Sequence, residues 1–399
     1  MSAFLLLAAC AKDPDYATGA AGSSGGPGGS GGGGTAGSGT GGSGLIGYTP
    51  PTLTITHANP IVSRGAQVFA MPDSGTASIV DGKYHAGGWI AGRPTDAAPA
   101  WVAIKLSATP TRVLVSWDDT GTYEYKTPTD KSVYGQPAAY SIQVSADSTN
   151  GADGTWTTVV PSVTNAVRTR GHAFDFAGKS WIKMTVTATP SNTTGNVIIA
   201  EIDVHDISAA GTGLPQDTWF FMGDSITAFA YDRRAANQPS FAELVHTAAP
   251  AYMPAMINGG IGSELTADGL ARLDEMLALN PDYRFFAITY GTNDSWGNKT
   301  DTTAFRANLQ AMITKLKAAG REPVLSHVPH SPDGNHNTLD MFNTVIDELT
   351  QHNGLQVGPD LTAWFKAHPD QFTDMVHPNY DGQKAMNKLW ADAMHHLYP

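Results

Sequence analysis

Residues 214–399 alternate short apolar runs with amphipathic segments, and this alternation narrows the folds that they can adopt. Residues 284–290 form a nearly continuous apolar run, as expected of a strand that is buried on both faces. Residues 302–319 instead repeat their apolar side chains at helical spacing, and Gly320 follows as a helix stop. Strands that alternate with helices predict a parallel sheet covered on both faces, which is an α/β fold.

The remaining segments of this region continue the same pattern. Short apolar runs predict further strands at residues 218–222, 255–258 and 323–326. Amphipathic segments and capping residues predict further helices that begin at Ser240 and that span residues 265–279, 338–351 and 380–397. The region is long enough to bury a sizeable core by itself.

Residues 48–208 have a different sequence pattern, in which no helical periodicity is sustained. Strand-like runs recur at short intervals, separated by clusters of Gly, Pro, Asp and Asn. The runs span residues 102–106, 112–117, 139–144, 156–160, 181–186 and 197–204. Several of them alternate apolar and polar side chains, as strands with one solvent-facing side do, so this region predicts an all-β sandwich.

Length and composition limit the domain count and the partners. A chain of 399 residues exceeds what one hydrophobic core usually serves, so we expect two folded domains. The 24 Lys and Arg against 36 Asp and Glu give a net charge of −12, which argues against nucleic acid as a partner. Cys10 is the only cysteine, so we expect neither an intrachain disulfide nor a thiolate zinc site.

The N-terminal residues predict export and anchoring. Residues 1–10 are mainly apolar and end in Leu-Ala-Ala-Cys, which resembles a bacterial lipoprotein box. The resemblance implies cleavage before Cys10 and a lipid anchor on that residue in an exported bacterial protein. Residues 18–47 are almost entirely Gly, Ser, Ala and Thr, a composition that cannot bury apolar surface and predicts a flexible tether. The predicted organisation is a signal segment at 1–10, a linker at 11–47, a β-sandwich domain at 48–210 and an α/β domain at 214–399.

Four short motifs occur in order along the α/β region. The first, Gly-Asp-Ser at 223–225, follows a predicted strand, so Ser225 stands at the strand's carboxyl end, where open α/β sheets bind ligands. The others are Asn-Gly-Gly-Ile-Gly-Ser at 258–263, Gly-Thr-Asn-Asp at 291–294 and Asp-Met-Val-His at 374–377. Together they supply a nucleophile, hydrogen-bond donors and an acid–base pair, and they predict a serine esterase.

The residue types fit this chemistry. A serine hydroxyl is a weak nucleophile until a neighbouring base accepts its proton, and His377 can do so near neutral pH. Asp374 lies three residues earlier, where a turn would aim its carboxylate at the other ring nitrogen of His377 and fix the tautomer. The predicted catalytic residues are therefore Ser225, Asp374 and His377, and this chemistry needs no cofactor or metal.

The four motifs resemble those of the SGNH or GDSL hydrolases, over residues 217–377. The resemblance implies a three-layer α/β/α fold and the hydrolysis of esters, thioesters or acetylated sugars. It also implies an oxyanion hole made by the backbone N–H of Ser225, the side-chain amide of Asn293 and a third backbone N–H. The family's usual glycine for that third donor falls on Ser263 here, with Gly262 as the alternative.

Residues 48–210 resemble the discoidin, or coagulation-factor type C, family of galactose-binding-like jelly rolls. The resemblance rests on the turn Asp81-Gly82, a strand that starts at Trp101, residues 140–145, Trp156 and the strand at 201–204. It implies a sugar-binding module and a possible structural calcium ion, with Asp81 and Glu201 as candidate ligands. Ordinary loop and surface carboxylates are the alternative interpretation for these two residues.

Other polar residues have simpler interpretations. His327, His330 and His336 cluster in one loop, but their spacing fits no familiar metal motif, and a polar loop on the substrate side is expected. Asp224 and Asp294 are expected to hold the motif loops by hydrogen bonds to the backbone.

The sequence as a whole predicts an exported esterase that removes short acyl groups, with an acetylated polysaccharide as the leading expectation for the substrate. Two alternatives stay open. One is a generic short-chain, aryl or polyester esterase or lipase without carbohydrate preference. The other is a carbohydrate-binding surface protein with weak catalysis.

Overall fold

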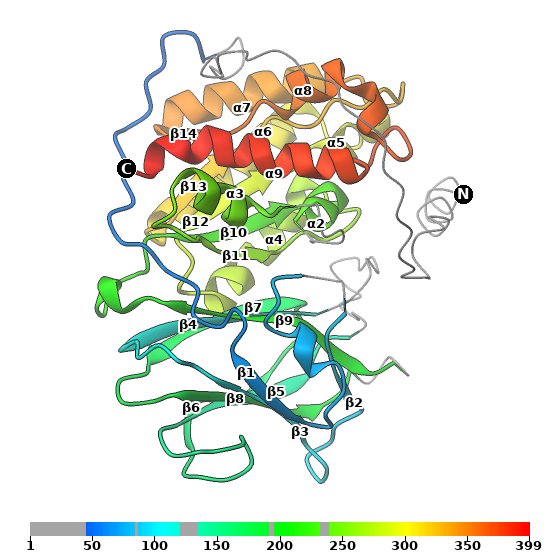
Figure 1. Cartoon of the computed structure of the whole chain (residues 1–399). Coiled ribbons are helices and arrows are strands. Elements are labelled where there is room, and N and C mark those ends of the chain that lie inside the picture. Colours follow the sequence, from blue (N-terminus) through cyan, green and yellow to red (C-terminus); the bar gives the residue numbers. More distant parts are fainter. Residues whose placement is uncertain (1–44, 84–86, 120–134, 191–194, 232–238) are drawn as a thin grey trace, which may run out of the picture. The chain divides into compact units, whose positions relative to one another are not determined.

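The computed structural model describes residues 45–83, 87–119, 135–190, 195–231 and 239–399 (Figure 1). The predicted signal segment, Cys10 and nearly all of the predicted linker lie outside the described residues. Gly41–Pro399 form one compact unit. Within the described part of the chain, no helix is both long enough and apolar enough to cross a bilayer.

The C-terminal part of the chain is built around a parallel sheet. Among the described residues, its strands lie in the order β11-β10-β12-β13-β14, and each runs parallel to its neighbour (Figure 1). The bounds are β10 Thr218–Gly223, β11 Ala255–Asn258, β12 Phe285–Thr289, β13 Glu322–Leu325 and β14 Gln356–Val357. The predicted parallel sheet is confirmed, and β14 adds a strand that the sequence did not indicate.

Helices cover both faces of this sheet and bury its strands on both sides. Phe220 and Met222 of β10 join one buried cluster, whereas Trp219 and Phe221, which point the opposite way, join another. The first cluster includes residues of α4 Thr266–Leu279, α6 Thr302–Ala318 and α7 Leu339–Asn353. The second includes residues of α2 Ser225–Ala230, α3 Phe241–Ala248, α8 Leu361–Ala367 and α9 Tyr380–Met394. The expected α/β/α layering of this region is therefore confirmed.

The strand order decides where a site can form. The first strand, β10, lies between the second and third, β11 and β12, so the connections leave it in opposite directions. Ligands of open α/β sheets bind at such a point, beyond the carboxyl ends of the strands. The segments that follow these three strands carry Ser225, Ser263 and Asn293 in turn. The topology thus brings three of the four predicted motifs to one edge of the sheet.

The N-terminal part of the compact unit contains antiparallel sheets. Among the described residues, one sheet has the strand order β1-β3-β8-β5-β6 and the other the order β2-β9-β4-β7, and buried side chains from both form one cluster. The bounds are β1 Gln67–Met71, β2 Trp89–Gly92, β3 Ala100–Lys105, β4 Arg112–Asp119, β5 Ala139–Ser145, β6 Thr157–Thr164, β7 Thr169–Asp175, β8 Trp181–Ala188 and β9 Val197–Asp206. All six predicted strands are present, and the assignment to the discoidin-like family stays a prediction.

The antiparallel and parallel sheets share contacts within the compact unit. The Gly171 N–H of β7 donates a hydrogen bond to Asn280 Oδ1 at 3.2 Å. A Cβ atom on Gly171 would lie 2.5 Å from the hydroxyl oxygen of Tyr283, so this contact requires glycine. Leu114 of β4 belongs to the same buried cluster as β10. The predicted boundary between 48–210 and 214–399 is bridged by these contacts, and independent folding of either part stays a prediction.

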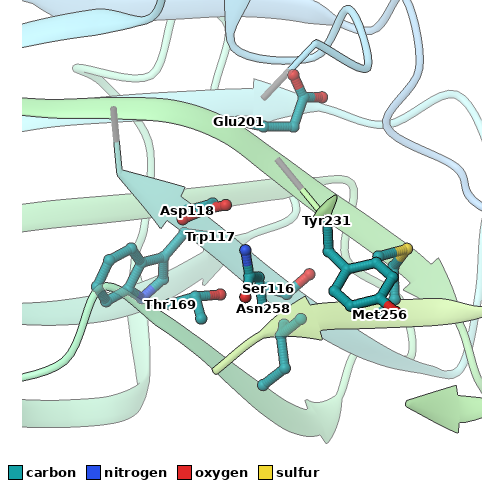
Figure 2. Close-up of a pocket in the computed structure, with 9 residues that line it drawn as sticks. Ser116, Trp117, Asp118, Thr169, Glu201, Tyr231, Met256 and Asn258 are labelled. Carbon is teal, nitrogen blue, oxygen red and sulfur yellow. The ribbon is translucent and has the colours of Figure 1, made fainter. Parts of the chain in front are cut away.

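A small cavity with both polar and apolar lining residues lies among these contacts (Figure 2). It has a volume of about 10 Å³ and is lined by residues that include Ser116, Thr169, Tyr231 and Asn258. That volume suffices for about one water molecule. Ser225 does not line the cavity, so the cavity is separate from the predicted active site.

Candidate active site

Ser225 is the first residue of α2 and directly follows the turn that ends β10. Asp224 caps this helix, because its Oδ1 accepts a hydrogen bond from the Ile226 N–H at 2.9 Å. Gly223 is so tightly packed that a Cβ atom there would lie 2.3 Å from the backbone oxygen of Thr289. The Gly-Asp-Ser motif therefore serves a tight strand-to-helix turn, with the serine side chain at the carboxyl end of the sheet.

His377 lies between Ser225 and Asp374. Its Nε2 is 2.9 Å from Ser225 Oγ, and its Nδ1 is 2.8 Å from Asp374 Oδ2. The second oxygen of Asp374 accepts hydrogen bonds from the backbone N–H groups of Val376 and His377, at 3.2 and 2.8 Å. Met375 closes this turn with a φ of 66°. The structure thus brings the three predicted catalytic residues together in the contact order of a serine triad.

The surroundings fix the histidine and keep its partner ionised. Burial by itself would raise the pKa of Asp374, but the hydrogen bonds from His377 and Val376 outweigh it and hold the pKa below its ordinary value. The ring of Phe229 packs edge-on against the His377 ring, with the ring centres 5.2 Å apart. Asp374 is therefore a carboxylate near neutral pH, suited to stabilise a protonated His377.

The loop after β11 passes directly along α2. A Cβ atom on Gly260 would lie 2.3 Å from the backbone nitrogen of Ala228, so only glycine allows this approach. Ser263 has a φ of 61°, in the left-handed region that favours glycine. The backbone N–H groups of Ser263 and Gly262 donate no hydrogen bond within the described part of the chain. Both therefore stay candidates for the third oxyanion donor.

Asn293 lies beside the same loop. Its Nδ2 donates a hydrogen bond to the backbone oxygen of Glu264 at 3.1 Å, and the side chain is only half-buried. The next residue, Asp294, accepts hydrogen bonds from the Thr266 N–H at 3.0 Å and from the Thr266 hydroxyl at 2.6 Å. The expected role of Asp294 in holding a motif loop is therefore confirmed.

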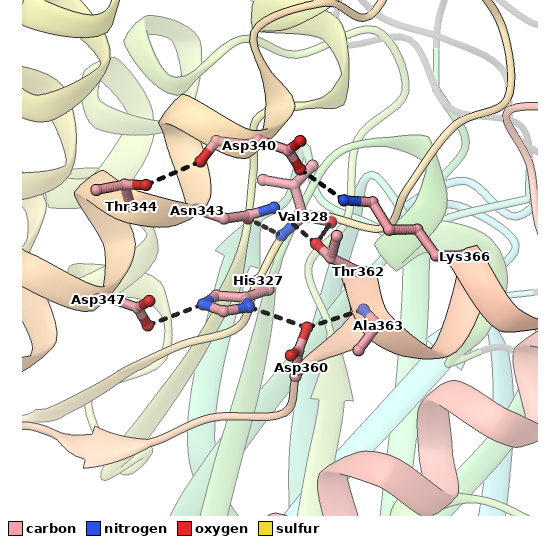
Figure 3. A network of polar contacts seen from close by, with 10 residues as sticks. All are labelled: His327, Val328, Asp340, Asn343, Thr344, Asp347, Asp360, Thr362, Ala363 and Lys366. Atoms are coloured by element: carbon pink, nitrogen blue, oxygen red, sulfur yellow. Dashed lines mark hydrogen bonds and ion pairs between the residues drawn. The ribbon is translucent and has the colours of Figure 1, made fainter. Parts of the chain in front are cut away.

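Two of the three clustered histidines, His327 and His336, have different hydrogen-bond partners, and Figure 3 shows those of His327. The His327 ring lies between two carboxylates, with Nε2 2.9 Å from Asp347 and Nδ1 3.0 Å from Asp360. Burial would lower the pKa of His327, but its two acidic partners raise it to about 9. His336 instead contacts the Ser295 hydroxyl at 2.7 Å. Among the described residues, no group of His, Cys, Asp and Glu side chains is arranged to hold a metal ion.

The two candidate calcium ligands have other partners. Glu201 is buried and paired with the guanidinium of Arg64, which also contacts Asp203 at 2.5 Å. Asp81 Oδ1 accepts a hydrogen bond from the Lys83 N–H at 2.9 Å. Arg64 supplies the positive charge beside Glu201, and the calcium site stays a prediction.

Comparisons with known proteins find sequence similarity to ester hydrolases. Residues 221–385 match the model of the GDSL-like Lipase/Acylhydrolase family. The match covers less than half of the chain and falls on the part that carries Ser225, Asn293 and His377. An arylesterase from Vibrio mimicus is 28% identical over 130 residues, which cover 32% of this chain and 64% of that relative. The chain thus spans less than two thirds of the length of this relative. Together, the family match and the relative support a carboxylic ester hydrolase.

Part of the chain is also similar to solved structures of other proteins. An acetylxylan esterase from Geobacillus stearothermophilus is 19% identical, with a TM-score of 0.37, and covers 44% of this chain and 94% of its own. A lipase/acylhydrolase from Enterococcus faecalis is 24% identical, with a TM-score of 0.38, and covers 45% of this chain and 95% of its own.

Proposed function

We propose that this protein hydrolyses esters of short acyl groups through a covalent acyl-enzyme on Ser225. The observation that carries the proposal is the continuous contact from Ser225 Oγ through the His377 ring to Asp374, at 2.9 and 2.8 Å. Nε2 of His377 accepts the hydroxyl proton as Ser225 Oγ bonds to the ester carbonyl carbon. The tetrahedral intermediate then collapses, and the leaving alcohol takes that proton from His377. A water molecule repeats the two steps and releases the acid.

The oxyanion of the tetrahedral intermediate needs hydrogen-bond donors that are already in place. We assign this role to the backbone N–H of Ser225, the side chain of Asn293 and the backbone N–H of Ser263. The position of Asn293 supports this assignment. Its side-chain amide lies beside the loop that carries Ser263 and is held there by a hydrogen bond to the Glu264 backbone oxygen. Removal of one such donor typically costs about 100- to 1,000-fold in kcat.

For the substrate, we propose an acetyl ester, with an acetylated polysaccharide as the natural class. The support is the resemblance of residues 48–210 to sugar-binding jelly rolls, together with serine in place of glycine at 263, which narrows the space for an acyl group. The arylesterase relative favours a second candidate, an aryl or generic short-chain esterase without carbohydrate preference.

The two candidates differ in their behaviour toward a substrate panel. The full chain should cleave p-nitrophenyl acetate faster than the butyrate and octanoate esters, and should release acetate from acetylated xylan. Activity on the aryl esters without release of acetate from the polysaccharide would favour the generic esterase. Binding of xylan with negligible turnover of every ester would instead indicate a carbohydrate-binding protein and contradict the proposed function.

We further propose that the protein is exported and anchored by a lipid on Cys10. The support is the apolar run that ends in Leu-Ala-Ala-Cys and the Gly/Ser-rich stretch that follows it. In bacteria that produce the chain, labelled fatty acid should be incorporated into the natural sequence and not into the Cys10→Ala variant. Equal labelling of both, or of neither, would contradict the lipid anchor.

A further inference from the structure

A buried polar cluster lies directly behind the loop that carries Ser263. It consists of Glu264, Arg272 and Tyr290, and we call it the Glu264 cluster. Glu264 Oε2 accepts hydrogen bonds from the Tyr290 hydroxyl at 2.6 Å and from Arg272 Nη2 at 2.9 Å, and Arg272 Nε lies 2.7 Å from Oε1. Glu264 and Tyr290 are each only 2% exposed.

The Glu264 cluster holds both ends of the loop. Arg272 Nη2 donates a hydrogen bond to the backbone oxygen of Gly259 at 2.7 Å, where the loop begins. Glu264 ends the loop, and its own backbone oxygen accepts the hydrogen bond from Asn293 Nδ2. Ser263, with its φ of 61°, lies between these two fixed points. The cluster therefore connects the two segments that carry the candidate oxyanion donors.

Tyr290, the third residue of the cluster, connects it to strand β12. Tyr290 directly follows β12 and stands three residues before Asn293. Its ring packs on α4 at Gly269, where a Cβ atom would lie 2.6 Å from the hydroxyl oxygen, so the helix admits the ring only because this residue is glycine. One hydroxyl group thus links the β12 segment to both charged residues, since it also accepts a hydrogen bond from Arg272 at 3.1 Å.

Stability alone does not account for such a cluster. A buried ion pair is often no more stabilising than apolar side chains of similar volume, because both charges must be desolvated. Burial raises the pKa of Glu264, although the charge of Arg272 opposes the increase. What the cluster offers beyond stability is a defined geometry, because its hydrogen bonds hold the Gly259 backbone oxygen at one end of the loop and the Glu264 side chain at the other.

We propose that Glu264, Arg272 and Tyr290 are positioning residues that set the spacing between the Ser263 N–H and the Asn293 side chain. The inference rests on the proposed function, because the spacing matters only if both groups bind an oxyanion. Donors that are misplaced by about 1 Å lose up to about 100-fold in rate. The cluster should therefore affect kcat and leave substrate binding nearly unchanged.

A pair of matched variants tests the proposal. Tyr290→Phe removes the hydroxyl from the cluster and retains the ring. Tyr252→Phe is the control, because Tyr252 is a buried tyrosine of the same part of the chain whose hydroxyl donates a hydrogen bond to Ile55 at 3.0 Å, outside the cluster. Tyr290→Phe should lower kcat on p-nitrophenyl acetate by about 10- to 100-fold with little change in KM. The control should lose stability to a similar extent and keep its kcat.

A second readout separates positioning from general destabilisation. Phenylboronic acid forms a tetrahedral adduct with a reactive serine, so its inhibition constant should weaken in Tyr290→Phe in proportion to the loss of kcat, and not in Tyr252→Phe. Arg272→Lys, which retains the charge but not the forked donor, should behave like Tyr290→Phe. An active parent protein with an unchanged kcat in Tyr290→Phe, or equal losses in both tyrosine variants, would overturn the inference. A parent protein without esterase activity would overturn the proposed function itself.

Discussion

Asp217, the residue before β10, accepts a 2.9 Å hydrogen bond from the hydroxyl of Tyr398, close to the C-terminal end of the chain. Trp219 Nε1 donates to the same carboxylate oxygen at 3.0 Å, and Asp217 is fully buried. Burial raises the pKa of Asp217 to about 7 from an ordinary value of 3.8, although these two donors oppose the increase. A buried titratable group therefore lies at the start of the strand that leads to Ser225.

This arrangement predicts a pH-dependent stability. The folded state binds the proton of Asp217 more tightly than the unfolded state does. The contribution of protonated Asp217 to the free energy of unfolding is therefore fully present below pH 3.8 and is lost as the pH rises through about 7. Asp217→Asn keeps an acceptor for both donors but cannot ionise. We expect it to raise the free energy of unfolding at pH 8 and to change it little at pH 4. Urea titrations at the two values measure this, and an equal effect at both would contradict the assignment.

His327 predicts a loss of stability in the same direction, as the pH rises, but over a higher pH range. The pKa of His327 in the folded state, about 9, exceeds the ordinary value of 6.5. Its contribution to the free energy of unfolding is therefore complete below pH 6.5 and is lost as the pH rises through about 9. His327→Gln leaves Asp347 and Asp360 without their shared cation. We expect a loss of roughly 3 kcal/mol in unfolding free energy at pH 6 and a smaller loss at pH 10.

A histidine on α7, the helix that carries Asp347, provides the control for this prediction. His352 is exposed in the last turn of α7, so His352→Gln should change the unfolding free energy little at either pH. If the loss in His327→Gln were the same at pH 6 and pH 10, His327 would not be held in its protonated form.

The sequence predicted the α/β region well because its signals are local. Continuous apolar runs marked β10 and β12, and the helix expected at 302–319 was found at Thr302–Ala318. The motif residues could also be placed, since each follows a strand end.

Two of the strands that the sequence did not indicate have clear reasons. β14 was missed because two residues cannot establish a pattern, and β7, in the antiparallel region, was missed because its sequence, Thr-Arg-Gly-His-Ala-Phe-Asp, is largely polar. Its Gly171 is explained only by Tyr283, more than a hundred positions away.

The surroundings of the site could not be predicted in the same way. Glu264 and Tyr290 are separated by 26 positions, and nothing in the local sequence of either one indicates that they meet. The left-handed conformation of Ser263 has no sequence signal either, because serine seldom adopts it. Such features arise from tertiary packing, which brings β11, α4 and β12 to the same edge of the sheet.

The contact between Asp374 and His377 predicts non-additive effects. His377→Ala should lower kcat by about 1,000-fold or more, and Asp374→Asn should lower it by a smaller factor. The double variant should be no slower than His377→Ala alone, because the carboxylate acts through the histidine. Steady-state kinetics of all three variants decide the question. A double variant that loses the product of the two single losses would show that the residues act independently.

The contacts between the two regions predict how a fragment behaves. Residues 214–399 contain every proposed catalytic group, so the folded fragment should hydrolyse p-nitrophenyl acetate at a rate close to that of the full chain. It should also melt at a lower temperature, because it lacks Ile55, which is buried in the same cluster as Trp390, and Gly171, which packs on Tyr283. Calorimetry and initial rates measure both quantities. A fragment that is as stable as the full chain would mean that these contacts contribute little.

The same fragment tests the proposed carbohydrate preference. A tethered binding region raises the local concentration of a polymeric substrate without changing the chemistry. Removal of residues 48–208 should therefore slow the release of acetate from acetylated xylan more than it slows the cleavage of p-nitrophenyl acetate. Equal slowing on both substrates would assign the antiparallel sheets a supporting role for the active site. No slowing on either would leave the generic esterase as the better account.

The central claim is that Ser225 is the nucleophile, and its removal tests this most directly. Ser225→Ala deletes a single hydroxyl group at a helix start and leaves Asp224, Gly223 and the packing of α2 unchanged. The measurement is kcat on p-nitrophenyl acetate for the full chain and the variant, with thermal melting as the check of folding. We predict a loss of at least about 1,000-fold at an unchanged melting temperature. A folded variant that retains turnover close to that of the parent protein would contradict the account.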